Sequence, residues 1–121
     1  MSHPALAVHG ALSRGVLAVA VLVSLAVLFA PGDDVPSSPP GVDKLVHCSL
    51  FLALALAGRW AGVRAGVLAV LLPVYAVASE LLQAYTALHR DGSVFDGLAD
   101  VLGVVLGLLA WEAVSRPRAA R

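Results

Sequence analysis

Apolar residues run along this chain in four long stretches, separated by short polar segments. The stretches cover residues 15–30, 45–63, 65–85 and 94–114. Each approaches the roughly 20 residues that an α-helix needs to cross about 30 Å of hydrocarbon. The first stretch is short unless Ala11 and Leu12 extend it. The pattern therefore predicts an all-α membrane protein, built as a bundle of four transmembrane helices.

The composition narrows the class of protein further. Of the 121 residues, 60% are hydrophobic and 13% are charged, which is more apolar surface than a soluble domain of this size can bury. Eight basic and eight acidic residues cancel, so the chain offers no basic face for nucleic acid. The single cysteine, Cys48, excludes an internal disulfide and a zinc cluster built on cysteines. We expect a membrane protein rather than a soluble enzyme.

The first stretch also has a second interpretation. A basic residue, Arg14, precedes it and a small residue, Ala30, ends it, as in a cleaved secretory signal. Pro31 follows Ala30 directly and is an unfavourable neighbour for cleavage at that point. We therefore expect a retained helix.

The basic residues predict how the bundle is oriented. Cytoplasmic flanks of membrane helices retain Lys and Arg during insertion. Only Lys44 and Arg90 lie on one side of the predicted bundle. Six arginines lie on the other side: Arg14, Arg59, Arg64, Arg116, Arg118 and Arg121. This predicts residues 1–14 as a cytoplasmic amino terminus, residues 15–114 as the four-helix membrane domain and residues 115–121 as a basic cytoplasmic tail.

Glycines recur at every fourth position in two places. Gly58, Gly62 and Gly66 follow one another at this spacing, and so do Gly103 and Gly107. Such spacing lets helices approach closely in a membrane. A composition rich in Ala and Gly explains the same pattern without any packing role, and the sequence leaves both interpretations open.

Polar side chains gather at the outer end of three predicted helices. Lys44 and His47 open the second helix on one face, and Glu80 lies about 22 Å above the inner edge of the third. Asp96 and Asp100, four residues apart, share one face of the fourth helix. The predicted ligand-binding residues are Asp43, Lys44, His47, Glu80, Gln83, Arg90, Asp96 and Asp100.

Burial of these charges requires partners. An unpaired charge in hydrocarbon costs on the order of 3 kcal/mol, so the acids are expected to face one another, a cation, His47 or a water-filled cavity. A structural clamp that only fixes helix register is one interpretation. Since a clamp needs two or three polar groups and this cluster has at least seven, we favour a functional site.

Three segments carry a family resemblance. They are residues 43–51 (DKLVHCSLF), 79–83 (SELLQ) and 90–103 (RDGSVFDGLADVLG), with Gly107 after them. In order and spacing they resemble the VanZ-like family of small multi-pass membrane proteins, whose founding member is associated with low-level teicoplanin resistance. The resemblance spans residues 42–107 and implies a multi-pass protein of the cell membrane that acts in the cell envelope.

The sequence departs from that family pattern at Asp100, where the family usually has Asn. Either Asp100 stays protonated and replaces the amide, or the site carries one more negative charge. The departure weakens any direct transfer of a family activity to this chain.

Binding is the first functional hypothesis. Arg90 and Lys44 would take an anionic phosphate or carboxylate of a lipid-linked or glycopeptide-type envelope molecule. Glu80, Gln83 and Asp96 would orient polar atoms of its head group. The expected partners are membrane lipids and this envelope ligand, and the expected outcome is an altered envelope or a changed susceptibility to teicoplanin-type drugs.

The second hypothesis is an intramembrane enzyme that acts on an envelope lipid head group. Its catalytic candidates are His47, Glu80 and Asp96, with Asp43 or Glu80 as the acid/base partner of His47. A metal-dependent variant would surround a divalent cation with these three candidates and Asp100. The chain has no H-E-x-x-H motif, so the sequence assigns no metal and no cofactor.

A proton or ion relay is the third hypothesis and ranks last, because the candidate groups crowd at one end of the bundle.

Overall fold

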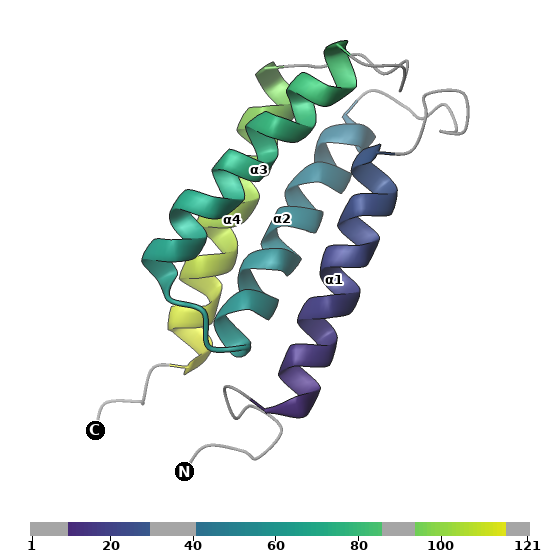
Figure 1. Cartoon of the computed structure of the whole chain (residues 1–121). Coiled ribbons are helices and arrows are strands. Elements are labelled where there is room, and N and C mark those ends of the chain that lie inside the picture. The colour runs from purple at the N-terminus through teal and green to yellow at the C-terminus, as the bar shows by residue number, and fades with distance from the viewer. Residues whose placement is uncertain (1–9, 30–40, 86–93, 116–121) are drawn as a thin grey trace.

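The computed structural model describes residues 10–29, 41–85 and 94–115 of the chain. They form α-helices in the order α1 (Ala11–Phe29), α2 (Val42–Trp60), α3 (Ala65–Tyr85) and α4 (Val94–Ser115). The helices run alternately up and down, so that α1 begins and α4 ends at the same end of the bundle (Figure 1). The helical fold predicted from the apolar pattern is confirmed.

Among the described residues, α1, α3 and α4 are long and apolar enough to cross a membrane. α2 does not meet the same condition, because Asp43, Lys44 and Arg59 all lie within its 19 residues. Three of the four expected membrane helices are therefore candidate spans by length and composition.

Two helices begin earlier than predicted. α1 begins at Ala11 rather than at residue 15, which gives the first apolar stretch a membrane-spanning length. α2 begins at Val42 rather than at residue 45. Gly41 precedes it with a left-handed φ of 89°, and its carbonyl accepts the first helical hydrogen bond from the Leu45 N–H at 3.0 Å. Lys44 consequently belongs to the first turn of α2.

α2 also ends earlier than predicted, at Trp60 rather than at residue 63. Gly62 adopts a left-handed φ of 96°, which breaks the helical path. The Gly62 N–H donates to the Arg59 carbonyl at 3.0 Å, and the Val63 N–H donates to the Gly58 carbonyl at 2.9 Å. These two bonds form a Schellman turn, which satisfies the last carbonyls of the helix and reverses the chain towards α3.

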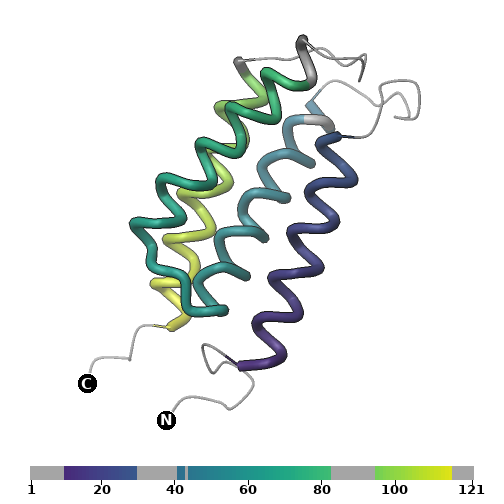
Figure 2. Tube along the Cα trace, in the orientation of Figure 1, coloured from purple at the N-terminus to yellow at the C-terminus, as the bar shows by residue number. Residues whose placement is uncertain are grey.

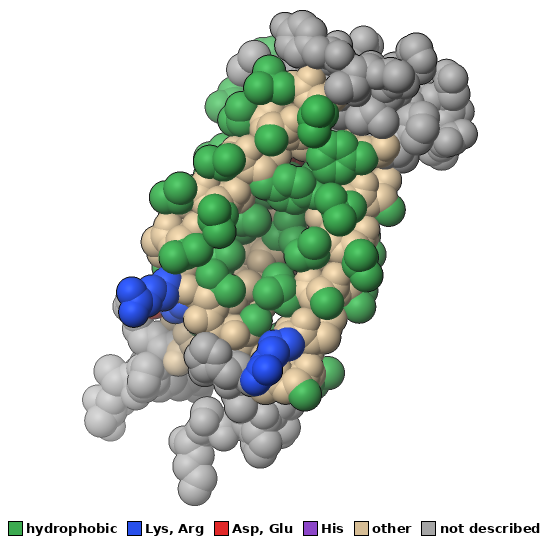
Figure 3. Space-filling view, in the orientation of Figure 1, with side chains coloured by type: hydrophobic (Ala, Val, Ile, Leu, Met, Phe, Trp, Pro, Cys, Tyr) green, Lys and Arg blue, Asp and Glu red, His purple; other side chains and the backbone are tan. Residues whose placement is uncertain are grey.

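A broad apolar band covers the outside of the bundle. Large side chains such as Val19, Val70 and Leu109 are each at least 60% exposed. Figure 3 shows this band on one face, with the Lys and Arg side chains of that face gathered at one end. Water solvates such a surface poorly, whereas lipid tails cover it without penalty. The surface is therefore that of a membrane protein.

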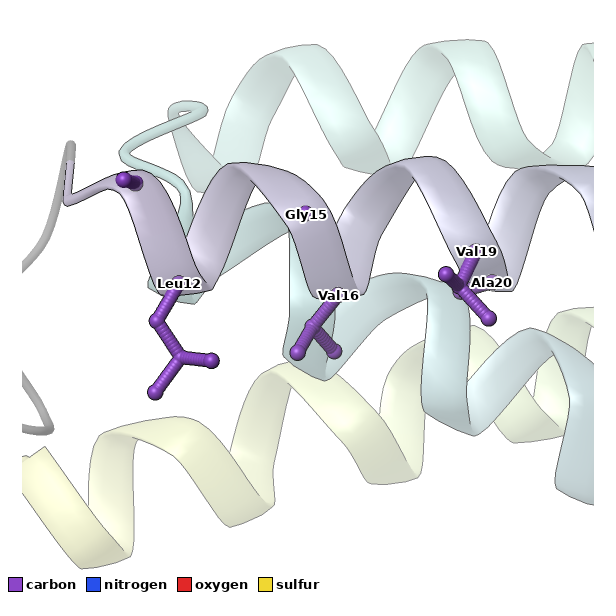
Figure 4. A pocket seen from close by; sticks show the side chains of 6 residues that line it. Leu12, Gly15, Val16, Val19 and Ala20 are labelled. Atoms are coloured by element: carbon purple, nitrogen blue, oxygen red, sulfur yellow. The ribbon is translucent and has the colours of Figure 1, made fainter.

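A shallow depression along the first half of α1 belongs to the same apolar surface (Figure 4). It is lined by Ala11, Leu12, Gly15, Val16, Val19 and Ala20. Because all of its lining residues are apolar or glycine, the depression offers no group that would recognise a polar ligand.

α2 lies in the middle of the bundle (Figure 2). It contacts each of the other three helices and packs most extensively against α4. The buried hydrophobic core consists of Leu28, Phe51, Leu54, Ala55, Leu68, Leu72, Ala76 and Val104. Three of these eight residues come from α2 and three from α3, so α2 contributes as much to this core as α3 does although it is the most polar of the four helices.

Two glycines of α4 let the α2 backbone approach directly. A Cβ atom on Gly103 would lie 2.1 Å from the Cys48 carbonyl oxygen, and one on Gly107 would lie 2.7 Å from the Leu52 carbonyl oxygen. The packing interpretation of the glycine spacing is therefore correct for this pair. It does not extend to Gly66, where a Cβ atom would meet nothing within 4 Å.

We expect Gly103→Ala to destabilise the bundle by about 1–3 kcal/mol, because its Cβ atom would force α2 and α4 apart. Gly97→Ala is the matched control on α4, since a Cβ atom there meets nothing within 4 Å. The control should leave the free energy of unfolding unchanged or slightly raised. Unfolding in detergent micelles measures both variants, and equal stability would contradict the close contact.

Candidate functional site

The outermost polar contact lies near the starts of α2 and α4. Lys44 Nζ donates to Asp96 Oδ1 at 3.0 Å. The Lys44 side chain is 45% exposed, whereas that of Asp96 is 5% exposed. A carboxylate inside the bundle therefore holds an ammonium group at the bundle edge.

One turn deeper, His47 on α2 meets Asp100 on α4. The His47 Nδ1 and Asp100 Oδ1 atoms lie 2.8 Å apart, and both residues are fully buried. His47 follows Lys44 by about one turn of α2, and Asp100 follows Asp96 by about one turn of α4. Each helix therefore carries two polar side chains on the same face. Because α2 and α4 run in the same direction, the two contacts form successive layers (Figure 1).

Glu80 reaches the deeper layer from α3. Its Oε1 atom lies 3.8 Å from His47 Nδ1, and its side chain is 12% exposed. His47, Glu80 and Asp100 each offer one ligand atom, and these atoms all lie within 4.8 Å of one another. An imidazole thus stands between two carboxylates from two other helices, a donor set that can share protons or hold a cation.

The close contact of α2 with α4 produces this geometry. Gly103 lies less than one turn after Asp100 and touches the carbonyl of Cys48, the residue after His47. With no side chain between the two backbones at this level, the short Asp100 side chain reaches the imidazole ring. The glycine and the histidine–aspartate contact are therefore parts of one arrangement.

Apolar and aromatic side chains close the site from below. Phe51, one turn after His47, is fully buried. Its ring centroid lies 5.7 Å from that of Tyr75. Ser79 Oγ donates to the Ala76 carbonyl at 2.8 Å, so its buried hydroxyl is satisfied within α3. This buried floor lowers the local dielectric beneath His47 and Asp100, which strengthens the electrostatic contact between them.

Sequence reasoning missed a second polar contact in the interior. Ser24 on α1 is fully buried, and its Oγ lies 2.9 Å from the Tyr75 hydroxyl oxygen on α3. The Ser24 hydroxyl also donates to the Val21 carbonyl at 2.7 Å. A signal was present in the sequence, because Ser24 is the only polar side chain within residues 15–30. The contact ties α1 to α3 beside the aromatic floor.

Another ion pair joins α2 and α4 at the opposite end of the bundle. Arg59 Nη2 lies 3.6 Å from Glu112 Oε1, with side chains that are 23% and 47% exposed. Arg59 also donates through Nη1 to the Val63 carbonyl at 3.0 Å. Exposed pairs of this kind contribute little to stability. This contact makes Glu112 a useful control position for the buried acids.

The structure brings together five of the predicted site residues: Lys44, His47, Glu80, Asp96 and Asp100. Asp43 and Gln83 lie in α2 and α3, but their side chains are outside the part of the chain that the structure describes. Arg90 lies outside the described residues altogether. The roles predicted for these three residues stay predictions.

Comparison of the chain with known protein families, with curated proteins and with solved structures finds no match. The VanZ-like resemblance accordingly stays a prediction from the three sequence segments. The site is therefore interpreted from its own geometry.

Proposed function

We propose that the chain is a multi-pass protein of the cell membrane in which α2 crosses the bilayer together with α1, α3 and α4. The polar residues of α2 support this, because Lys44 and Arg59 lie near its two ends. Long basic side chains at helix ends extend to the membrane interface. Between these ends, residues 48–58 are uncharged and largely apolar, and α2 contacts each of the other three helices.

In the proposed orientation both termini are cytoplasmic and the polar cluster faces the outer side. Arg14, Arg59 and Arg64 all lie towards the end of the bundle where α1 begins, whereas Lys44 lies towards the opposite end. The positive-inside rule supports a cytoplasmic location for the arginine-rich end. The arginines of residues 116–121, which contributed to the same expectation, lie outside the described residues.

Single cysteines test this orientation in a Cys48→Ala background. An impermeant maleimide added to intact cells is expected to label Val42→Cys, at the start of α2, but not Arg64→Cys, between α2 and α3. Both positions are exposed in the structure. Arg64→Cys should react only after the membrane is permeabilised. Labelling of Arg64→Cys alone in intact cells would reverse the orientation, and labelling of both would contradict a spanning α2.

The proposed activity is binding of an anionic head group at the outer end of the bundle. The carrying observation is the Lys44 ammonium, which is 45% exposed while the buried Asp96 carboxylate fixes its position. A phosphate or carboxylate can approach the exposed part of this cation, and the positive charge of the ammonium attracts it. His47 and Glu80 beneath it supply further polar groups for a ligand that enters between the helices.

A lipid-linked or glycopeptide-type envelope molecule is the proposed ligand class. Membrane lipids already surround the bundle, so a head group attached to a lipid reaches Lys44 without leaving the outer leaflet. The VanZ-like segments support the same class and suggest an effect on susceptibility to teicoplanin-type drugs. Arg90, from the segment between α3 and α4, is the second proposed cation of the site.

An intramembrane enzyme that acts on the same head group is the alternative. The 2.8 Å contact between His47 Nδ1 and Asp100 Oδ1 favours it, because a buried carboxylate orients an imidazole for proton transfer. Glu80, partly exposed beside His47, would be the second acid/base group. Binding and catalysis therefore make different demands on His47.

Lipid mass spectrometry on detergent-purified protein tests the proposal. Wild-type protein is expected to retain an anionic envelope lipid. Lys44→Gln should retain about tenfold less of this lipid, because it loses a charged hydrogen bond to the head group. The control Arg64→Gln, an exposed arginine at the opposite end, should retain it.

The same measurement separates binding from catalysis. Under binding, His47→Gln and wild-type protein retain the same head group. Under catalysis, His47→Gln enriches a head group that wild-type protein converts. Equal lipid content in wild type, Lys44→Gln and Arg64→Gln would contradict recognition at this end of the bundle.

A further inference from the structure

Three ligand atoms from three different helices meet in the deeper layer of the site. His47 on α2 offers a ring nitrogen, and Glu80 on α3 and Asp100 on α4 each offer a carboxylate oxygen. His47 and Asp100 are fully buried, so two of the three donors are held away from water and within a packed interface. Mixed nitrogen and oxygen donors of this kind can coordinate a transition-metal ion.

We propose that His47, Glu80 and Asp100 bind a divalent transition-metal ion, Mn²⁺ or Zn²⁺. Metal bonds of about 2.1 Å separate neighbouring donors by about 3.0 Å in an octahedron and about 3.4 Å in a tetrahedron. Two observed separations bracket these values, with 2.8 Å from His47 Nδ1 to Asp100 Oδ1 and 3.8 Å from His47 Nδ1 to Glu80 Oε1. All three ligand atoms lie within 4.8 Å of one another, so the carboxylates would turn towards the ion to complete the coordination.

The charge of the cluster supports a divalent ion. Three carboxylates, from Glu80, Asp96 and Asp100, face one ammonium group, that of Lys44, and one imidazole. Carboxylates buried beside hydrocarbon are stabilised by positive charge close to them. A divalent ion would add positive charge between Glu80 and Asp100 and contact each side chain of the deeper layer.

The chemistry of the donors selects among metals. One imidazole nitrogen with two carboxylate oxygens suits Mn²⁺ and Zn²⁺, whereas Ca²⁺ and Mg²⁺ prefer sites made of oxygen atoms alone. Binding at Nδ1 requires the neutral tautomer that carries its hydrogen on Nε2, so the Nδ1 lone pair faces the metal and the imidazole keeps its one hydrogen. No oxidant or reductant is involved.

The surroundings of the site also suit an ion. Gly103 fixes the distance between α2 and α4 beside His47 and Asp100, which preorganises two of the donors. The Glu80 side chain is 12% exposed, so an ion can reach the site from the side of this residue. Three protein donors leave a coordination position for water or a phosphate oxygen. Only this last link to a head group depends on the function proposed above; the ion site does not.

Metal titration of the full-length protein in detergent, with no lipid added, tests the proposal. After removal of metal by a chelator, the wild-type protein is expected to retain one Mn²⁺ per chain through gel filtration, as counted by mass spectrometry. Glu80→Gln and Asp100→Asn preserve shape and hydrogen bonding but remove a charged donor, so each should weaken Mn²⁺ binding at least about tenfold. Glu112→Gln, an acid at the other end of α4, should bind Mn²⁺ as the wild type does.

A spectroscopic readout keeps the test decisive if a variant folds poorly. Bound Mn²⁺ should show the electron spin-echo modulation of a single imidazole nitrogen, and His47→Gln should abolish it. The proposal is overturned if wild-type protein retains neither Mn²⁺ nor Zn²⁺, if the bound ion shows no nitrogen signal, or if all three substitutions leave binding unchanged. Lipid retention by metal-free wild type is scored separately, so failure of the ion site and failure of head-group binding are distinguishable.

Discussion

A polar side chain placed inside an apolar helix bundle must find its partner within the protein, and this constraint shapes the whole molecule. The His47–Asp100 contact is its clearest expression, with 2.8 Å between two fully buried residues on neighbouring helices. The contact requires the backbones of α2 and α4 to lie against each other with no side chain between them. Gly103 permits that approach because it places no side chain against the Cys48 carbonyl. Packing and polar chemistry are thus fixed by the same few atoms.

Solvent exposure within the site consequently falls over two helical turns. Lys44 stands half-exposed in the outermost layer, His47 is buried in the next, and Phe51 forms a fully apolar floor. A charged group of a ligand would meet a hydrated cation first, whereas an ion bound deeper would be held in a low dielectric. This gradient is compatible with both proposals, in which the outer layer recognises a head group and the deeper layer binds a metal ion.

The apolar pattern was sufficient to place all four helices. Its errors concern helix ends, where single residues override the hydrophobic pattern. α2 ends at Trp60 because Gly62 takes a left-handed conformation, which no hydropathy pattern records. The sequence also identified Lys44, His47, Glu80, Asp96 and Asp100 as a group at one depth. It could not pair Lys44 with Asp96 or His47 with Asp100, because pairing depends on how the helices are rotated against one another. No local metal motif could appear either, since the three donors come from three separate helices.

Nitrogen-15 magnetic resonance of His47 in lipid bilayers tests the central claim most directly. The resonance is identified by its loss in His47→Gln, which separates it from the other three histidines of the chain. A buried imidazole that is hydrogen-bonded through Nδ1 to a carboxylate should change its chemical shift strongly in Asp100→Ala and stay unchanged in Glu112→Gln. A His47 resonance that is the same in both variants, or that matches a water-exposed imidazole, would contradict the account.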